Sequence, residues 1–367
     1  MGEIPVKTEE LDKRSNHARY LQLDGIKGII CFFIIFVHYY NRTPDNAFPI
    51  TWIPHILVAD SWMFVEFFFI ISGFLFAKSW KKRIPTCGFR PYILSRLKRL
   101  YPSVVLITVF DALTRVVHMW VNHAGDRITL GNLLKSLTFA STWLYNEEPF
   151  PTVLWYIHVL FLCYLLYYFI AKRKTQTQYI TAVVALVFFG WALYAKKLSF
   201  PFLYKNIGRG YLSFEIGLLI YEFQTMTSEK LRRKISYWAF GLSALSLAAA
   251  YFLTFDKFYG DMLLTCTLFL FPAAMLSLLN IPWIGKIFSI KPLVWLGEIS
   301  MSTFLVHVPV MNLIKSLCKP TGALPFDSPV TFAVVLVFIF VIAVLWHYLI
   351  EKKLIPMCLR QMTGKSA

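Results

Sequence analysis

Long apolar runs alternate with short polar, often basic, stretches along nearly the whole chain. An α-helix of about 20 apolar residues crosses a hydrocarbon core about 30 Å thick, and most of these runs approach that length. We predict ten spans, at about residues 25–41, 57–77, 100–120, 153–171, 179–195, 207–224, 235–254, 259–279, 293–314 and 329–350. The pattern therefore predicts an all-α fold, a polytopic integral membrane bundle of about ten transmembrane helices.

Composition supports this class, since 57% of the residues are hydrophobic and only 16% are charged. Soluble domains carry about a quarter charged residues. Most of the 37 lysines and arginines fall in alternate connections, which by the positive-inside rule predicts two cytoplasmic termini. The net charge of +17 thus reports topology, and we expect no nucleic-acid partner. A basic connection between the spans 179–195 and 207–224 leaves the order of the middle helices open.

The predicted organisation is a cytoplasmic segment at 1–24, a transmembrane domain at 25–352 and a cytoplasmic tail at 353–367. The first twenty residues are polar and lack an apolar centre, so we expect no removable signal peptide. Six cysteines occur without any C-x-x-C spacing, which indicates neither a disulfide framework nor a metal site. We therefore expect a multi-pass protein of the cell membrane, most simply the inner membrane of a bacterium.

The first span carries a cation at one end and an imidazole near the other. Lys27 and His38 are eleven residues apart, which on an α-helix is three turns plus about 20°, or roughly 16 Å along the axis. The two side chains therefore share one face. An ionisable group at membrane depth indicates a functional site. The alternatives are a histidine that snorkels to the far interface and one that hydrogen-bonds within the bundle.

Glu66 lies among aromatic residues in the second span. Membrane carboxylates usually face the bundle interior and have a partner, for which His38 is a candidate. Such a pair would fix the imidazole tautomer. The adjacent Ser72-Gly73 is a small-residue notch that lets another helix pack closely.

Arg96 and Arg99 enter the third span on one helical face. Arginine binds phosphate in a bidentate manner, so the pair would suit a phosphate-rich ligand. The alternative is the ordinary basic flank of a cytoplasmic helix end.

Other polar groups lie in the later spans, and we treat His158, Ser300 and His307 as candidate substrate contacts. Hydroxyls and imidazoles on membrane helices also serve in polar packing between helices. In the span 207–224, Glu215 is a candidate partner for Arg209.

Together these segments resemble the membrane-bound acyltransferase family 3, whose O-acyltransferases modify cell-surface glycans and related acceptors. Lys27 and His38 match the family's basic residue and catalytic histidine, and residues 65–74 match its carboxylate, aromatic pair and Ser-Gly-Phe segment. Residues 96–102 match R-x-x-R-x-x-P, and residues 297–307 match Gly-x-x-Ser to Leu-x-His. The resemblance extends from about residue 23 to 351.

The chain departs from many members in two respects. Trp155 is not followed by the Glu of their Trp-Ser-Leu-x-x-Glu motif, and no SGNH-type domain is present. The resemblance thus indicates a short form, which leaves the acceptor contacts open.

The resemblance implies transfer of an acyl group, usually acetyl, from cytoplasmic acyl-CoA to a hydroxyl of a glycan or glycolipid. Here His38 would be the general base, Glu66 a second catalytic group, and Lys27, Arg96 and Arg99 the CoA contacts. Acyl-CoA is then a co-substrate with no permanently bound cofactor and no metal, and membrane lipid surrounds the bundle. The oligomeric state stays open and includes a homo-oligomer. The alternative is a proton-coupled secondary transporter, which should show inverted repeats that we do not find in the sequence.

Overall fold

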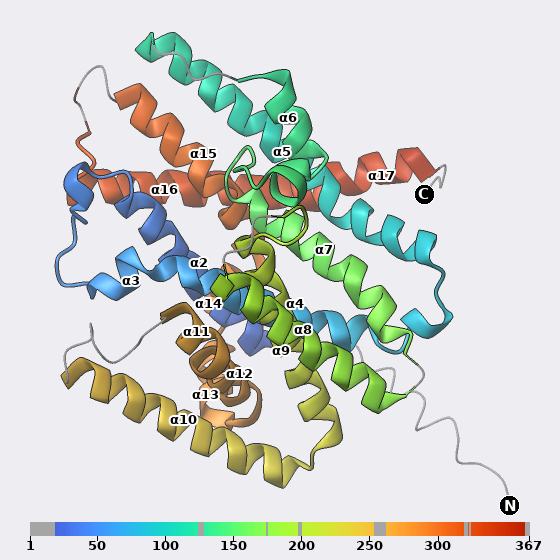
Figure 1. The fold of residues 1–367 in the computed structure, drawn as a ribbon. Coiled ribbons are helices and arrows are strands. Elements are labelled where there is room, and N and C mark those ends of the chain that lie inside the picture. The colour runs from blue at the N-terminus through green and yellow to red at the C-terminus, as the bar shows by residue number, and fades with distance from the viewer. Residues whose placement is uncertain are drawn as a thin grey trace, which may run out of the picture.

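A computed structural model describes residues 19–123, 128–173, 175–196, 200–252, 262–318, 322 and 324–363. Within these ranges every regular element is a helix, as the sequence predicts. Helices α2 (Leu21–Tyr40) and α4 (Phe64–Trp80) lie in the middle of the molecule, and α10 (Glu229–Phe252) runs along its lower edge (Figure 1). Most of the predicted segment 1–24 lies outside the described residues.

Eight helical stretches among the described residues are long and apolar enough to cross a membrane, so the chain is a multi-pass membrane protein. They are Leu21–Tyr40 (α2), Ser61–Trp80 (η2 and α4), Phe89–Asn122 (α5), Leu154–Ala171 (α7), Gln176–Lys196 (α8), Met262–Asn280 (α11, η6 and α12), Ser300–Cys318 (α15) and Pro329–Leu359 (α16, η7 and part of α17). The other two predicted spans correspond to α9 (Lys205–Met226) and α10, which do not belong to this apolar group.

Three of these stretches consist of several helices. They contain η2 (Ser61–Met63) before α4, then α11 (Met262–Thr265), η6 (Cys266–Leu270) and α12 (Phe271–Asn280), and finally α16 (Pro329–Leu345), η7 (Trp346–Leu354) and the start of α17 (Ile355–Thr363). The segments between the stretches contain the short helices η1 (Pro44–Asn46), α3 (His55–Ala59), η3 (Ile84–Thr86), α6 (Leu130–Leu137), η4 (Ser141–Tyr145), α13 (Pro282–Phe288) and α14 (Lys291–Glu298).

The predicted span 293–314 is not one continuous helix. It comprises most of α14 and most of α15, which are separated at Ile299. The Ser300 hydroxyl donates to the Gly297 carbonyl at 2.8 Å at this break. The break brings α14 alongside the start of α2, where the Gly297 Cα lies so close to the Asp24 backbone that a Cβ would not fit.

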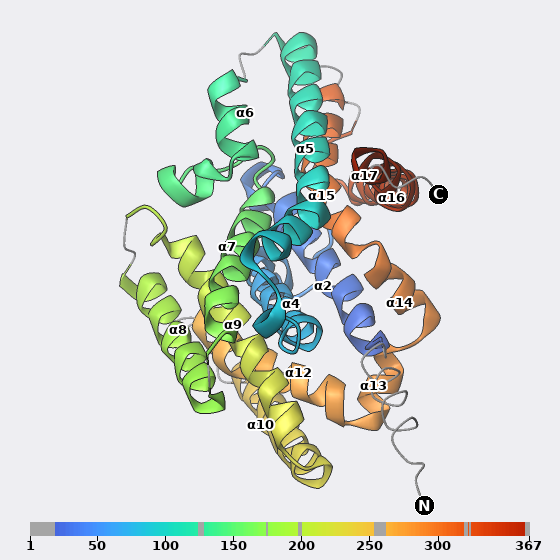
Figure 2. The same ribbon diagram turned by 90° about the vertical axis from the view of Figure 1, so that its right-hand side faces the viewer.

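The packing of α4 against α9 confirms the small-residue notch. A Cβ on Gly73 would collide with the Phe214 carbonyl, and one on Gly217 would collide with the Ile70 carbonyl. Glycine in both helices therefore allows the two backbones to touch. Figure 2 shows α2 and α4 at the centre, with α8, α9 and α10 on one side and α16 with α17 seen end-on at the other. The central pair carries the predicted site residues.

Candidate functional site

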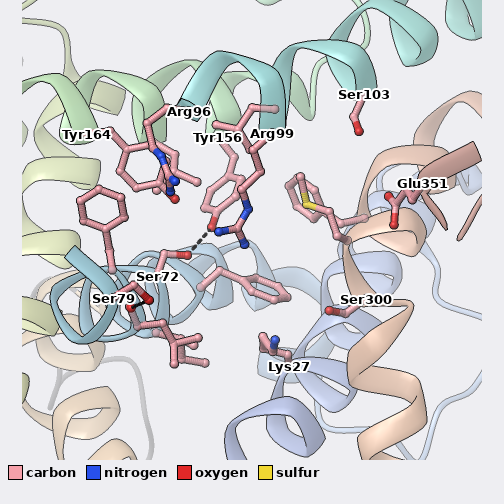
Figure 3. Close-up of a pocket in the computed structure, with 18 of the residues that line it drawn as sticks. Lys27, Ser72, Ser79, Arg96, Arg99, Ser103, Tyr156, Tyr164, Ser300 and Glu351 are labelled. Atoms are coloured by element: carbon pink, nitrogen blue, oxygen red, sulfur yellow. Dashed lines mark hydrogen bonds between the residues drawn. The ribbon is translucent and has the colours of Figure 1, made fainter. Parts of the chain in front are cut away.

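A cavity of about 560 Å³ lies between α2, α4, α5, α7 and α15 and is closed on one side by η7 and α17 (Figure 3). It is lined by Lys27, Phe68, Ile71, Ser72, Leu75, Phe76, Ser79, Trp80, Arg96, Arg99, Leu100, Ser103, Tyr156, Leu160, Tyr164, Ser300, Met301, Phe304, Glu351 and Ile355. Four sequence-predicted site residues are among them: Lys27, Arg96, Arg99 and Ser300. The volume is within the range of about 300–1,000 Å³ that small-molecule sites occupy.

Arg96 and Arg99 descend from α5 towards the cavity, opposite Lys27 of α2 (Figure 3). Arg96 is buried, and its guanidinium lies 4.4 Å from the ring of Trp80, which fixes its plane by a cation–π contact. Arg99 is exposed at the mouth and has no hydrogen bond or ion pair with any described residue. The structure therefore gathers three cations from two helices around one opening.

The charge of Lys27 is balanced by a cluster at the start of α2. Asp24 accepts from Lys27 at 2.7 Å and from Arg19 at 2.5 Å, and Arg19 also donates to Glu298 at 2.7 Å. The hydrogen bonds to Glu298 and then Asp24 raise the pKa of the Arg19 guanidinium above its ordinary value. Two cations face two carboxylates here, so the positive charge without a balancing carboxylate in this cluster comes from Arg96 and Arg99, while Glu351 is the other carboxylate that lines the cavity.

The inner end of the cavity is aromatic. Phe68 and Tyr156 lie 6.1 and 5.4 Å from the ring of Phe304, centroid to centroid. The Ser72 hydroxyl is 2.9 Å from that of Tyr156 (Figure 3). Aromatic rings thus line the cavity both beside Arg96 and at Phe304, and the Ser72 and Tyr156 hydroxyls lie near Arg99 (Figure 3).

Two histidines lie just beyond this aromatic end. The ring centroids of His38 and His307 are 4.9 Å apart, and His307 is 5.8 Å from Phe304. Neither histidine lines the cavity. The ring of Phe304 therefore stands between the cavity and the histidine pair.

Hydrogen bonding fixes the tautomer of His307. Its Nδ1 lies 2.7 Å from the Phe304 carbonyl and 3.3 Å from the Thr303 carbonyl, and since a carbonyl only accepts, Nδ1 carries the proton. The buried Nε2, which has no partner among the described atoms, is then an acceptor. His38 is held through its backbone, whose carbonyl accepts from Arg42 at 2.5 Å.

Helices α2 and α15 run side by side in matching register. The Cys31 thiol contacts the Ser300 carbonyl at 3.5 Å, and seven residues further along each helix the two histidines meet. The helix that carries Lys27 and His38 is continuous, as predicted. The same two helices thus supply one wall of the cavity and the histidine pair.

The suggested pairing of Glu66 with His38 is wrong. Glu66 is fully buried and accepts from Arg209 Nε at 2.5 Å. The guanidinium also lies 5.0 Å from the ring of Trp62 and 4.6 Å from that of Trp155. Glu215, the other candidate partner of Arg209, is buried with neither carboxylate oxygen bonded among the described atoms.

His158 lies apart from the cavity. Its Nδ1 is 2.8 Å from the Thr142 hydroxyl, its carbonyl accepts from the indole of Trp143 at 2.9 Å, and its ring lies 4.6 Å from that of Phe139. These contacts tie α7 to the segment 139–143. The structure thus places His158 in helix packing, away from the other predicted site residues.

Several lining groups were not predicted from the sequence, namely Ser72, Ser79, Tyr156, Tyr164 and Glu351. Glu351 is 3.0 Å from His347 on η7. Ser72 carries a signal in the sequence, since it belongs to the Ser-Gly-Phe segment, but Ser79, Tyr156, Tyr164 and Glu351 belong to none of the matched segments. Among the described residues no group of three or more His, Cys, Asp or Glu side chains could hold a metal ion.

Comparison with known proteins identifies the family of the chain. Over 93 residues the chain is 31% identical to "Protein 2 in picA locus" of Rhizobium radiobacter, a match that covers 24% of this chain and 41% of that protein. No solved structure matches the chain. A family model described as an acyltransferase domain matches residues 20–350, and the chain therefore belongs to acyltransferase family 3.

Proposed function

We propose that this protein transfers an acyl group, most simply acetyl, from cytoplasmic acyl-CoA to a hydroxyl of a cell-surface glycan or related acceptor. The observation that carries the proposal is the cavity that has Lys27, Arg96 and Arg99 at its mouth and ends one aromatic ring away from two histidines. Family membership supplies the acyltransferase class.

The chemistry of CoA suits this cavity. Its phosphates need cationic donors, and arginine provides bidentate hydrogen bonds to phosphate oxygens. Neither arginine has an ion pair to break among the described residues, and Arg96 is pre-oriented by Trp80, with only a 3.2 Å hydrogen bond from its Nε to the Ser95 hydroxyl. The thin pantetheine arm can then run along α2, whose Lys27 and His38 are roughly 16 Å apart along the helix axis.

The acyl thioester would reach the aromatic end, close to His38. His38 takes the proton of the acceptor hydroxyl as its oxygen attacks the thioester carbonyl. The C–S bond breaks, and the thiolate receives that proton as the free thiol of CoA. General-base assistance of this kind is worth about 10²–10⁴-fold in rate. No net proton is released, so the two histidines need no exit path to water.

His307 would keep His38 in the required state. Its Nδ1 donates to the backbone, so its Nε2 offers a lone pair beside the neighbouring ring. An N–H of His38 directed towards this lone pair leaves the other His38 nitrogen free to act as the base. We therefore assign His307 a positioning role in the same step.

A secondary transporter would use the same histidines as a proton relay without an acyl donor. The two readings differ in covalent outcome, because only the transferase changes the mass of an acceptor. We therefore compare surface glycans and lipids, by mass spectrometry, from cells with and without the gene. A gain of one acyl group that depends on the gene supports the proposal, and unchanged masses in every glycan and lipid fraction contradict it.

A further inference from the structure

A second, smaller pocket lies near the opposite end of α4 from the Arg96 and Arg99 mouth. It holds about 210 Å³ and is lined by Thr142, Asn146, Glu147, Glu148, Pro149, Thr152, Trp155, Asn206 and Arg209. Arg209 bonds Glu66 in the first turn of α4, whereas the large cavity includes Trp80 in the last turn. Fourteen residues of helix span about 20 Å, so the two openings are well separated.

The inner wall of this small polar pocket is a buried cation with spare donors. Arg209 is only 9% exposed, and its Nε is committed to Glu66. Its Nη1 makes only a 3.4 Å contact with Asn206, and its Nη2 makes no hydrogen bond among the described atoms. Because Nη2 is enclosed, the donor that Arg209 can offer to a ligand at this wall is Nη1, in place of its long contact with Asn206.

The rim of the small polar pocket supplies acceptors. Glu147 is neutralised by Lys135 at 2.9 Å, but Glu148 receives only a 3.3 Å hydrogen bond from Thr152 and has no ion pair among the described residues. Asn146 and Asn206 add amides that both donate and accept. Donors at the base and acceptors at the rim fit a group that does both.

The segment that carries this rim is fixed in place. Tyr204 donates to the Leu144 carbonyl at 2.6 Å, and the Phe202 amide donates to the Trp143 carbonyl at 2.7 Å. The pocket is therefore held between the starts of α7 and α9, and a ligand would find it preformed.

We propose that the small polar pocket binds one hydroxyl-rich ring, a pyranose unit of the acyl acceptor. A hydroxyl both donates and accepts, so one ring can meet Arg209, Asn206 and Glu148 together. The half-buried indole of Trp155 offers an apolar wall for a ring face. The uncompensated Glu148 disfavours an anion, a cation offers no acceptor to the Arg209 donor, and the small volume excludes a longer saccharide from entering whole. This inference rests on the proposed function. Within it, the buried ion pair with Glu66 holds Arg209 in place at the inner wall of the small polar pocket.

The test is saturation-transfer-difference NMR on the full chain in lipid nanodiscs, with no sugar-based detergent present. The probes are methyl glucoside, methyl galactoside and methyl N-acetylglucosaminide, with cyclohexanol as an apolar ring and tetramethylammonium as a competitor. We expect saturation of the ring protons of at least one pyranoside and no effect of tetramethylammonium. In Glu148→Gln the affinity for that pyranoside should fall by about tenfold or more, because a hydrogen bond to a charged group is lost.

Matched variants separate a local effect from a general one. Glu229→Gln makes the same change at an exposed glutamate of α10 and should leave binding unchanged. Trp155→Phe keeps an aromatic wall and should retain part of the affinity. No saturation of any pyranoside by the folded protein, equal binding in Glu148→Gln, or displacement by tetramethylammonium would each overturn the inference. The assay contains no acyl donor, so its failure is distinct from failure of CoA to bind, which calorimetry on the same nanodiscs measures.

Discussion

The ring centroids of His38 and His307 lie 4.9 Å apart, one on each of two neighbouring helices. The backbone of α15 fixes the proton of His307 on Nδ1, which leaves Nε2 as the acceptor nitrogen of that ring. This relationship assigns the two imidazoles different tasks. His38 lies on the same face of α2 as Lys27, which lines the cavity, whereas the ring of His307 is hydrogen-bonded to the backbone of α15.

His307→Gln should lower kcat while KM for acetyl-CoA stays unchanged. The reason is that His307 does not line the cavity where the donor would bind, but it contacts the ring of His38. We expect a loss smaller than the about 10²–10⁴-fold that accompanies removal of a general base. Steady-state kinetics with acetyl-CoA measures both constants. An unchanged kcat with a raised KM for the acceptor would instead make His307 a substrate contact.

Arg96→Ala and Arg99→Ala should both weaken CoA binding, measured by calorimetry in nanodiscs. Each charge-assisted phosphate contact is worth about 1.5–3 kcal/mol, or roughly tenfold or more in affinity. Because salt screens such contacts, binding by the wild type should weaken between low and high salt more than binding by the double variant. Arg90→Ala alters an exposed arginine of the same helix that does not line the cavity and should have no effect. An unchanged affinity for CoA in the double variant would contradict the phosphate contacts and leave the arginines as the ordinary basic flank of a cytoplasmic helix end.

Glu66→Gln should destabilise the fold, because it leaves the buried Arg209 charge without its partner. Removal of one member of a buried ion pair costs about 3–5 kcal/mol. Denaturant unfolding in detergent measures the change, and a double-mutant cycle with Arg209→Gln should show coupling between the two sites. A catalytic acid at position 66 predicts the reverse pattern, in which stability is retained and transfer is lost.

Phe304→Leu should relax the choice of acyl chain. The ring of Phe304 closes the end of the cavity, so a smaller side chain leaves room for additional methylenes. The ratio of kcat/KM for butyryl-CoA to that for acetyl-CoA should rise by about tenfold or more, since each methylene in a pocket is worth about 1–3 kcal/mol. Phe271→Leu, a buried phenylalanine outside the cavity, is the matched control. An equal ratio in both variants would place the acyl tip elsewhere.

Several parts of this arrangement follow from the sequence because they depend on local periodicity. The length of α2 and the placement of Lys27 at the cavity follow from one apolar run with helical spacing. Arg96 and Arg99 share a face because they are three residues apart, and both line the cavity. The notch at Gly73 is likewise a local feature, and α9 packs into it.

Other parts depend on contacts between distant segments. Glu66 and Arg209 are 143 residues apart, and nothing in either segment shows which cation the carboxylate meets. The break at Ile299 depends on close packing against α2, which hydropathy does not register. Helix α9 does not belong to the eight candidate spans because it carries charged residues such as Arg209 and Glu215. The tertiary structure buries both side chains, which hydropathy along the sequence does not show.

The central claim is that an acyl group leaves CoA for an acceptor with the help of His38. Membranes that contain the wild type or His38→Ala are incubated with acetyl-CoA labelled in the acetyl group, and the label in glycan and lipid fractions is counted. His55→Ala, at an exposed histidine, controls for loss of an imidazole, and protein in the membrane is quantified for each variant. We predict that the label appears with the wild type and with His55→Ala and falls by about 10²–10⁴-fold with His38→Ala. Equal labelling by His38→Ala, or no labelling by the wild type, would contradict the account.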